Sequence, residues 1–131
     1  MPRILIAEDD PAVRRFVARA LTHRGYEVTA AEDGIAALEA LSDASYDLLL
    51  TDIVMPGLDG IALALKVTRE HPGMPVLMMS GFSAERQRAH NLDELIHRVI
   101  PKPFTLEEIC KVVEETLAEV RGGEAQQKRR G

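Results

Sequence analysis

Carboxylates stand directly after two apolar segments of the chain. Glu8, Asp9 and Asp10 follow the segment Ile-Leu-Ile-Ala, and Asp52 follows Leu-Leu-Leu-Thr. Removing a carboxylate from water is costly unless a group of opposite charge lies beside it. Several carboxylate oxygens in one place would attract a hard cation such as Mg²⁺, which one or two carboxylates commonly bind together with a phosphate oxygen. Beside such a cation, the Asp52 carboxylate can act as a nucleophile toward phosphorus.

Two further polar residues follow other apolar segments. Ser80 comes after Val-Leu-Met-Met, and Lys102 comes after Val-Ile-Pro. A serine hydroxyl can donate a hydrogen bond to one phosphoryl oxygen, and a lysine ammonium can neutralise another. The first acidic turn lacks the glycines with which dinucleotide and P-loop proteins cradle a phosphate. These residues therefore predict a metal-assisted phosphoryl site rather than a nucleotide site.

The elements that must position these residues alternate along the chain. Strands are predicted over residues 4–7, 27–31, 48–51 and 75–79, with a short fifth strand around 99–100. Five strands alternating with five helices predict an α/β fold, in which a parallel five-stranded sheet carries helices on both faces. Ligands of such sheets bind beyond the carboxyl ends of the strands, where all four candidate segments end.

Helix starts and buried helix faces follow from local patterns. Caps are predicted at Asp10, Asp33, Asp59, Ser83 and Thr105, and Asp10 is interpreted as a cap rather than a metal ligand because Pro11 follows it. The residues from Thr105 to Glu108 have capping-box spacing. The predicted buried residues are Val13, Phe16, Val17, Ala20 and Leu21 in the first helix, Ile35, Leu38 and Leu41 in the second, and Leu106, Ile109, Cys110, Val113, Leu117 and Val120 in the last.

Length, composition and charge limit the classes of protein to which the chain can belong. The chain has 131 residues, of which 46% are hydrophobic, and a formal net charge of -5. One domain over residues 1–120 is expected, followed by a flexible tail over 121–131 that lacks apolar periodicity. The negative charge argues against a nucleic-acid partner. No signal peptide or membrane-spanning segment is predicted, so we expect a cytoplasmic location without membrane insertion.

The acidic pair Glu8-Asp9, Asp52 within Asp-Ile-Val-Met-Pro-Gly-Leu-Asp-Gly, Ser80 and Lys102-Pro-Phe resemble the receiver domain of two-component response regulators. The resemblance to this CheY-like fold covers about residues 3–120 in register. It implies the strand order 2-1-3-4-5 and phosphorylation of Asp52 by a histidine kinase or histidine phosphotransferase. It also implies that Ser80 and Lys102 sense the phosphate. Such a domain catalyses only its own phosphorylation and dephosphorylation and is otherwise not an enzyme.

The same resemblance implies a Mg²⁺ site and one special peptide bond. Asp9 and Asp52 would bind Mg²⁺ directly, Glu8 mainly through water, and the backbone carbonyl of Val54 would be a further ligand. The bond between Lys102 and Pro103 would be cis.

One position departs from the family pattern. Val99 stands three residues before the lysine, where many receivers carry an aromatic ring that swings inward on activation. An aromatic switch of that kind is therefore not carried over, and Phe82 is the substitute that the sequence offers.

A narrower resemblance concerns the output. The stretch Gly-Phe-Ser-Ala-Glu-Arg-Gln-Arg and the residues after it resemble CpdR-type single-domain regulators. These regulators help load substrates onto the AAA+ protease ClpXP when unphosphorylated, so ClpX, ClpXP and its substrates become candidate partners. The alternative is a diffusible CheY-like messenger that acts when phosphorylated.

Three other functions fit the sequence less well. A haloacid-dehalogenase-type phosphohydrolase needs Asp-x-Asp after its first strand, but Glu8, Asp9 and Asp10 stand there. A Toprim-type nuclease needs Asp-x-Asp after a later strand, but Ile53 and Val54 follow the aspartate there. A degenerate receiver that binds partners without phosphorylation would not need the complete set of acids.

Overall fold

The sheet is the element that brings the predicted site residues together. The computed structural model describes residues 2–81 and 98–130, with residues 121–130 described as backbone only. Its five strands are β1 (Arg3–Ala7), β2 (Glu27–Ala31), β3 (Leu48–Asp52), β4 (Val76–Ser80) and β5 (Arg98–Pro101). All are parallel, in the order β2-β1-β3-β4-β5. The predicted fold class and strand order are confirmed.

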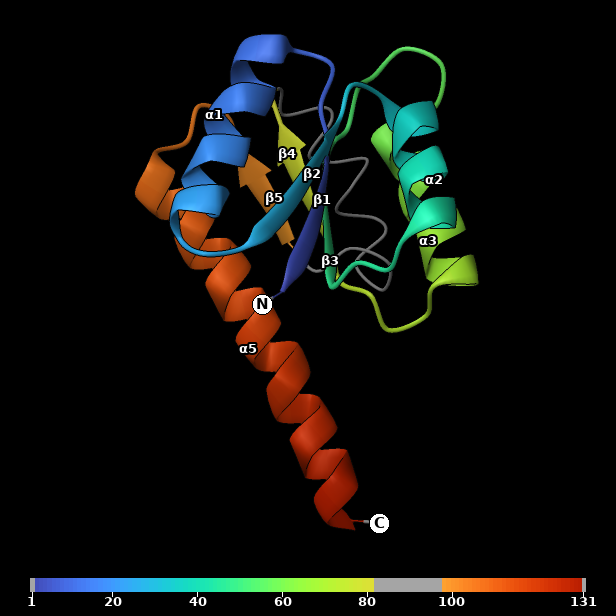
Figure 1. Cartoon of the computed structure of the whole chain (residues 1–131), viewed down its shortest axis with the longest axis vertical. Coiled ribbons are helices and arrows are strands. Elements are labelled where there is room, and N and C mark those ends of the chain that lie inside the picture. Colours follow the sequence, from blue (N-terminus) through green and yellow to red (C-terminus); the bar gives the residue numbers. More distant parts are fainter. Residues whose placement is uncertain (1, 82–97, 131) are drawn as a thin grey trace.

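The described helices cover both faces of the sheet. They are α1 (Pro11–His23), α2 (Gly34–Asp43), α3 (Gly60–Glu70) and α5 (Leu106–Arg130). Helices α1 and α5 lie on one face and α2 and α3 on the other, as Figure 1 shows. The predicted helix after Ser83, that cap and Phe82 lie outside the described residues. Covering both faces explains why β3 and β4 are buried at every residue.

Side-chain caps begin the helices where the sequence predicted them. Asp10, Asp33 and Asp59 accept hydrogen bonds from the backbone N–H groups of Ala12, Ala36 and Ala62 at 2.9, 2.8 and 2.9 Å. The capping box before α5 is also confirmed. Thr105 Oγ1 accepts from the N–H of Glu108 at 3.1 Å, and Glu108 Oε1 accepts from the N–H of Thr105 at 3.2 Å.

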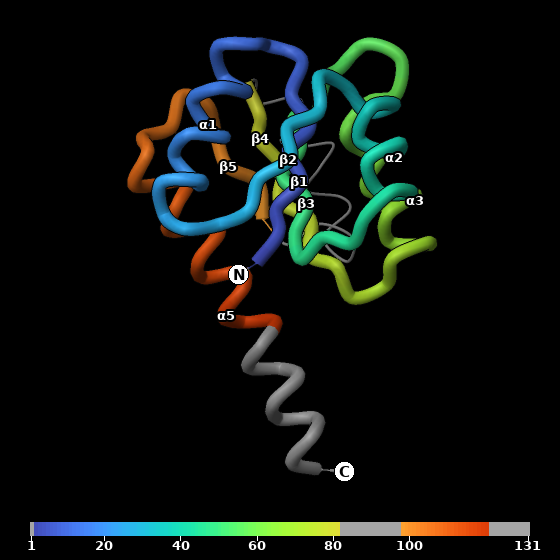
Figure 2. Tube along the Cα trace, in the orientation of Figure 1, coloured from blue at the N-terminus to red at the C-terminus, as the bar shows by residue number. Residues whose placement is uncertain are grey.

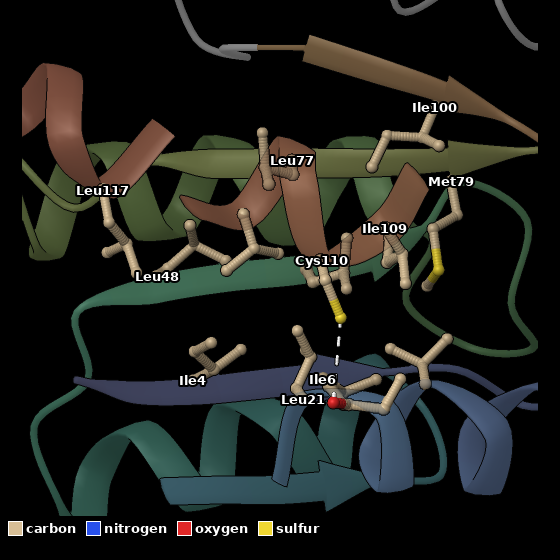
Figure 3. Packing of buried hydrophobic residues seen from close by; sticks show 14 residues of the cluster. Ile4, Ile6, Leu21, Leu48, Leu77, Met79, Ile100, Ile109, Cys110 and Leu117 are labelled. Atoms are coloured by element: carbon tan, nitrogen blue, oxygen red, sulfur yellow. Dashed lines mark hydrogen bonds between the residues drawn. The ribbon is translucent and has the colours of Figure 1, made fainter. Parts of the chain in front are cut away.

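Two apolar clusters fill the space between the sheet and its helices. The cluster beneath α1 and α5 includes Ile4, Ile6, Leu21, Leu48, Leu77, Met79, Ile100, Ile109, Cys110, Val113 and Leu117, most of which are labelled in Figure 3. The Cys110 thiol lies 3.7 Å from the carbonyl oxygen of Ala20 and joins α5 to α1. Burial raises the pKa of this thiol. Cys110 is therefore a core residue of the α1–α5 contact.

Some residues of the predicted helix stripes are more exposed than expected. Phe16, Ile35 and Leu106 are 42, 53 and 39% exposed, and Val120 is half-buried. Phe16 and Leu106 line one apolar groove between α1 and the start of α5, and the Phe16 ring lies 6.4 Å from that of Phe104. The prediction that these residues are buried was wrong, because the apolar spacing on a helix does not show which of its residues the rest of the fold covers.

The last helix is longer than the sequence predicted. Helix α5 continues to Arg130, although residues 121–130 carry no apolar stripe. The helix passes through Gly122 and Gly123, which have low intrinsic helix propensity, into Glu, Ala, Gln, Lys and Arg residues, which have high propensity. The domain boundary near residue 120 stays a prediction. Among the described residues, no helix is both long and apolar enough to cross a membrane.

Candidate functional site

Three carboxylates meet at the carboxyl ends of β1 and β3. These strands are neighbours, and Ala7 pairs with Thr51, so the residues that follow them emerge side by side. The connections after the two strands lie at the same end of the sheet, the upper end in Figure 2. One oxygen from each of Glu8, Asp9 and Asp52 lies within 4.8 Å of the other two. Glu8 and Asp52 are buried, whereas Asp9 is exposed.

Lys102 reaches this group from the end of β5. Its Nζ donates to Glu8 Oε1 at 2.7 Å and lies 3.3 Å from Asp52 Oδ1. The backbone N–H of Lys102 donates to the carbonyl oxygen of Ser80 at 2.7 Å. The Lys102–Pro103 bond is cis, as the family resemblance implied. One ammonium therefore lies between two buried carboxylates.

The pKa values of Glu8 and Lys102 show how strongly these groups interact. Burial raises the pKa of Glu8 from 4.5 to about 7, and the negative charge of Asp52 acts in the same direction against the hydrogen bond from Lys102. Burial alone would lower the pKa of Lys102, but the hydrogen bond to Glu8 and the charges of Asp52 and Glu8 outweigh it and raise that pKa. The site holds more negative charge than one lysine neutralises.

Backbone groups hold Asp52 in place. Its Oδ1 accepts from the N–H of Ile53 at 3.0 Å, and the Thr51 hydroxyl donates to the Asp52 carbonyl oxygen at 2.9 Å. The N–H of Gly60 donates to the carbonyl oxygen of Ile53 at 2.7 Å. A Cβ atom on Gly60 would collide with the carbonyl oxygen of Asp52. Gly60 is thus required for the close approach of α3, a role that its sequence context as a helix start did not reveal.

Side chains hold the acidic turn after β1. Glu8 Oε2 accepts from the N–H of Asp10 at 3.3 Å. Arg14 Nη1 donates to the carbonyl oxygen of Glu8 at 2.8 Å and lies 3.5 Å from that of Asp9. Arg14 was not among the residues predicted for the site. The only available signal was its position one turn into the helix that Asp10 caps.

The other predicted site residues lie around this centre. Ser80 is buried at the end of β4, next to β3, in which Asp52 pairs with Met79. Val54 follows β3 by two residues and is 52% exposed. Asp10 is not in the carboxylate group and serves as a cap, as predicted. Val99, at the position of the family's aromatic residue, is half-buried and packs on the α2–α3 side.

The donor set fits Mg²⁺. Hard cations prefer oxygen ligands, and Mg²⁺ in particular keeps several waters while binding one or two carboxylates. The buried Glu8 and Asp52 would supply negative charge, and the exposed Asp9 leaves the group open toward solvent. Burial, and to a lesser degree the charge of Asp52, raise the pKa of Glu8, and a divalent cation beside these carboxylates would favour their charged forms. The residues present can therefore hold this ion.

The fold and the acidic group together define a class of signalling module. The chain belongs to the response regulator receiver domain family, whose model matches residues 4–114. This membership favours a receiver over the phosphohydrolase and nuclease alternatives. Receiver domains are signalling modules of two-component systems and receive phosphate from histidine kinases.

Particular relatives refine this assignment. The chain is 40% identical over 117 residues to the response regulator receiver protein CpdR of Brucella abortus, and the match covers 89% of this chain and 98% of that protein. It is 39% identical over 120 residues to the transcriptional activator protein PfeR of Pseudomonas aeruginosa, where the match covers 92% of this chain but 39% of that protein. The solved structure of response regulator protein TrrA from Thermotoga maritima, in complex with Mg(2+)-BeF, has a TM-score of 0.79 at 28% identity. That match covers 88% of this chain and 98% of the solved one.

Proposed function

We propose that this receiver accepts a phosphoryl group on Asp52 from a phosphohistidine donor. An Asp52 carboxylate oxygen bonds to phosphorus while the phosphorus–nitrogen bond of the donor breaks, and the departing imidazole takes up a proton. The observation that carries this proposal is the convergence of three carboxylates and Lys102 from three separate strand ends. Backbone contacts hold Asp52 at the open end of the sheet, where a donor histidine can approach.

Glu8, Asp9, Asp52 and the backbone carbonyl of Val54 would hold Mg²⁺. The ion would shield the charge of Asp52 and the incoming phosphoryl oxygens. The solved structure of the similar protein TrrA in complex with Mg(2+)-BeF supports this assignment. Asp9 suits direct binding because it is exposed, whereas the buried Glu8 already forms an ion pair with Lys102.

Ser80 and Lys102 would respond to the phosphorylated state. Lys102 lies 2.7 Å from Glu8 and 3.3 Å from Asp52, so a phosphoryl group on Asp52 would compete with Glu8 for its ammonium. Ser80 ends the neighbouring strand and would donate its hydroxyl to another phosphoryl oxygen. Such a redistribution would shift a two-state equilibrium of the partner-binding face.

For the output, we favour a cytoplasmic adaptor of the CpdR type. The similarity to CpdR covers 98% of that protein, whereas the chain spans 39% of PfeR. An adaptor of this type would be active when unphosphorylated and would bring substrates to ClpXP. The second candidate is a CheY-like messenger that acts when phosphorylated.

Acetyl phosphate with Mg²⁺ tests the phosphorylation step. Intact-mass spectrometry should show the addition of one phosphoryl group to the protein, none in Asp52→Asn, and none when the metal is chelated. Asp43→Asn is the matched control, because Asp43 is exposed at the end of α2, and it should be modified like the unchanged protein. Full modification of Asp52→Asn would contradict the choice of acceptor.

A pull-down tests the output. Immobilised protein is compared before and after phosphorylation, with Asp52→Asn as a bait that cannot be phosphorylated. Recovery of ClpX on the unphosphorylated protein and on Asp52→Asn, but not on the phosphorylated protein, would support the adaptor. Partners recovered only on the phosphorylated bait would support the messenger instead.

A further inference from the structure

Asp9 differs from the other carboxylates of the site in how it is held. Glu8 accepts from Lys102 and from the N–H of Asp10, and Asp52 accepts from the N–H of Ile53. Among the described residues, none donates a hydrogen bond to the exposed Asp9 carboxylate. The position of that carboxylate therefore depends on the backbone that carries it.

One side chain contacts this backbone from α1. Arg14 Nη1 donates to the carbonyl oxygen of Glu8 at 2.8 Å and lies 3.5 Å from the carbonyl oxygen of Asp9. Arg14 is half-buried, and α1 itself is anchored next to the turn by the Asp10 cap. Arg14 thus ties the two peptide groups of the acidic turn to the first turn of the helix.

We propose that Arg14 is a positioning residue of the Mg²⁺ site, acting through the backbone of Glu8 and Asp9. This inference rests on the proposed metal site. By holding both carbonyl groups, Arg14 keeps the Asp9 carboxylate beside Glu8 and Asp52. Its planar guanidinium suits this contact because one end can serve two acceptors.

The direction in which Mg²⁺ affinity changes when Arg14 is replaced distinguishes a positioning role of Arg14 from an effect of its charge. On Coulombic grounds alone, removal of a guanidinium cation next to the site would strengthen Mg²⁺ binding. Loss of positioning would weaken it, because a ligand that is no longer oriented binds less well. Partners that orient metal ligands typically change metal affinity by 10- to 100-fold, and we expect about tenfold weaker binding in Arg14→Gln.

The measurement is a Mg²⁺ titration of the ¹⁵N-labelled whole chain by NMR, without any phosphodonor. Arg14→Gln should need about tenfold more Mg²⁺ for half-saturation, and Arg14→Lys should recover part of the loss because it keeps one donor. Arg15→Gln is the matched control, since Arg15 is exposed on the same helix, and it should bind like the unchanged protein. Thermal unfolding without Mg²⁺ identifies any variant that fails to fold.

A double-mutant cycle with Asp9→Asn tests whether Arg14 affects Mg²⁺ binding through Asp9. If Arg14 acts through Asp9, Arg14→Gln should cost much less Mg²⁺ affinity in the Asp9→Asn background. Unchanged or tighter binding in Arg14→Gln, or fully additive effects, would overturn the inference. Absence of Mg²⁺ binding by the unchanged protein would instead overturn the proposed metal site, so the two failures are distinguishable.

Discussion

At the end of β3, the shortest hydrogen bond to the Asp52 carboxylate comes from a backbone N–H, whereas at the end of β1, the shortest one to the Glu8 carboxylate comes from the Lys102 side chain, and the Arg14 side chain holds the backbone of the acidic turn. The β3 side consists of Asp52, Ile53 and Gly60, which are linked by N–H donors and by a contact that only glycine permits. The β1 side consists of Glu8 and Asp9, which depend on Lys102 and Arg14.

This difference would suit the phosphorylation proposed above. The proposed nucleophile would have to stay in one place, and backbone N–H groups would favour this because the fold fixes their positions. The β1 side would have to change partners when a cation or a phosphoryl group arrives. Long cationic side chains can move between acceptors, so their contacts can be redistributed.

Lys102→Met should destabilise the β1 side, with the largest loss of unfolding free energy among these variants. It leaves the buried Glu8 without its cation, and breaking a buried ion pair costs about 3 kcal/mol of unfolding free energy. Urea denaturation at pH 8 without Mg²⁺ measures this loss. Added Mg²⁺ should restore part of the stability, and Lys66→Met, on the exposed face of α3, should change little. Equal stability of the two variants would contradict the role of Lys102 in holding Glu8.

Gly60→Ala should destabilise the β3 side. The new Cβ would meet the Asp52 carbonyl oxygen, and the backbone shift that relieves the clash should cost about 2 kcal/mol. The same denaturation experiment measures it. Gly81→Ala provides the control, because a Cβ there meets no atom of the described residues within 4 Å. A Gly60→Ala protein as stable as the Gly81→Ala protein would show that α3 tolerates a wider approach.

Glu8→Gln tests the β1 side through the pH dependence of the unfolding free energy. Because folding raises the pKa of Glu8 from 4.5 to about 7, the folded protein binds more protons than the unfolded chain between these values. Stability without Mg²⁺ should therefore fall as pH rises from about 4.5 to 7, by at most about 1.4 kcal/mol per pH unit. This fall should flatten in Glu8→Gln. An unchanged slope, measured by denaturation across this range, would assign the pH dependence to other groups.

Asp10→Ala and Asp59→Ala compare the helix caps of the two sides, and their effects should be the smallest. Each cap accepts a backbone hydrogen bond at 2.9 Å, so each substitution should cost about 1 kcal/mol. Thermal unfolding of both variants measures this. A much larger loss in Asp10→Ala would mean that the β1 side depends on the cap as well as on Lys102 and Arg14.

Much of the fold and part of the site follow from local chemistry. Apolar runs are strands because a sheet covered on both faces excludes water along the whole strand. Aspartate before a helical pattern caps the helix because its oxygen satisfies a free N–H group. Parallel strands then bring Glu8, Asp9, Asp52, Ser80 and Lys102 to one edge, which sequence order alone predicts.

Other features depend on distances between elements. Periodicity identifies the apolar side of a helix but not the width of the surface that covers it, so the exposure of Phe16, Ile35 and Leu106 was not predicted. The sequence of the last segment likewise did not reveal how far α5 continues. The helices and strands along the chain and the acidic edge of the sheet thus follow from the amino-acid sequence. The contact of Gly60 with Asp52 and that of Arg14 with the acidic turn do not follow from it, because they depend on where α3 and α1 approach the strand ends in the folded protein.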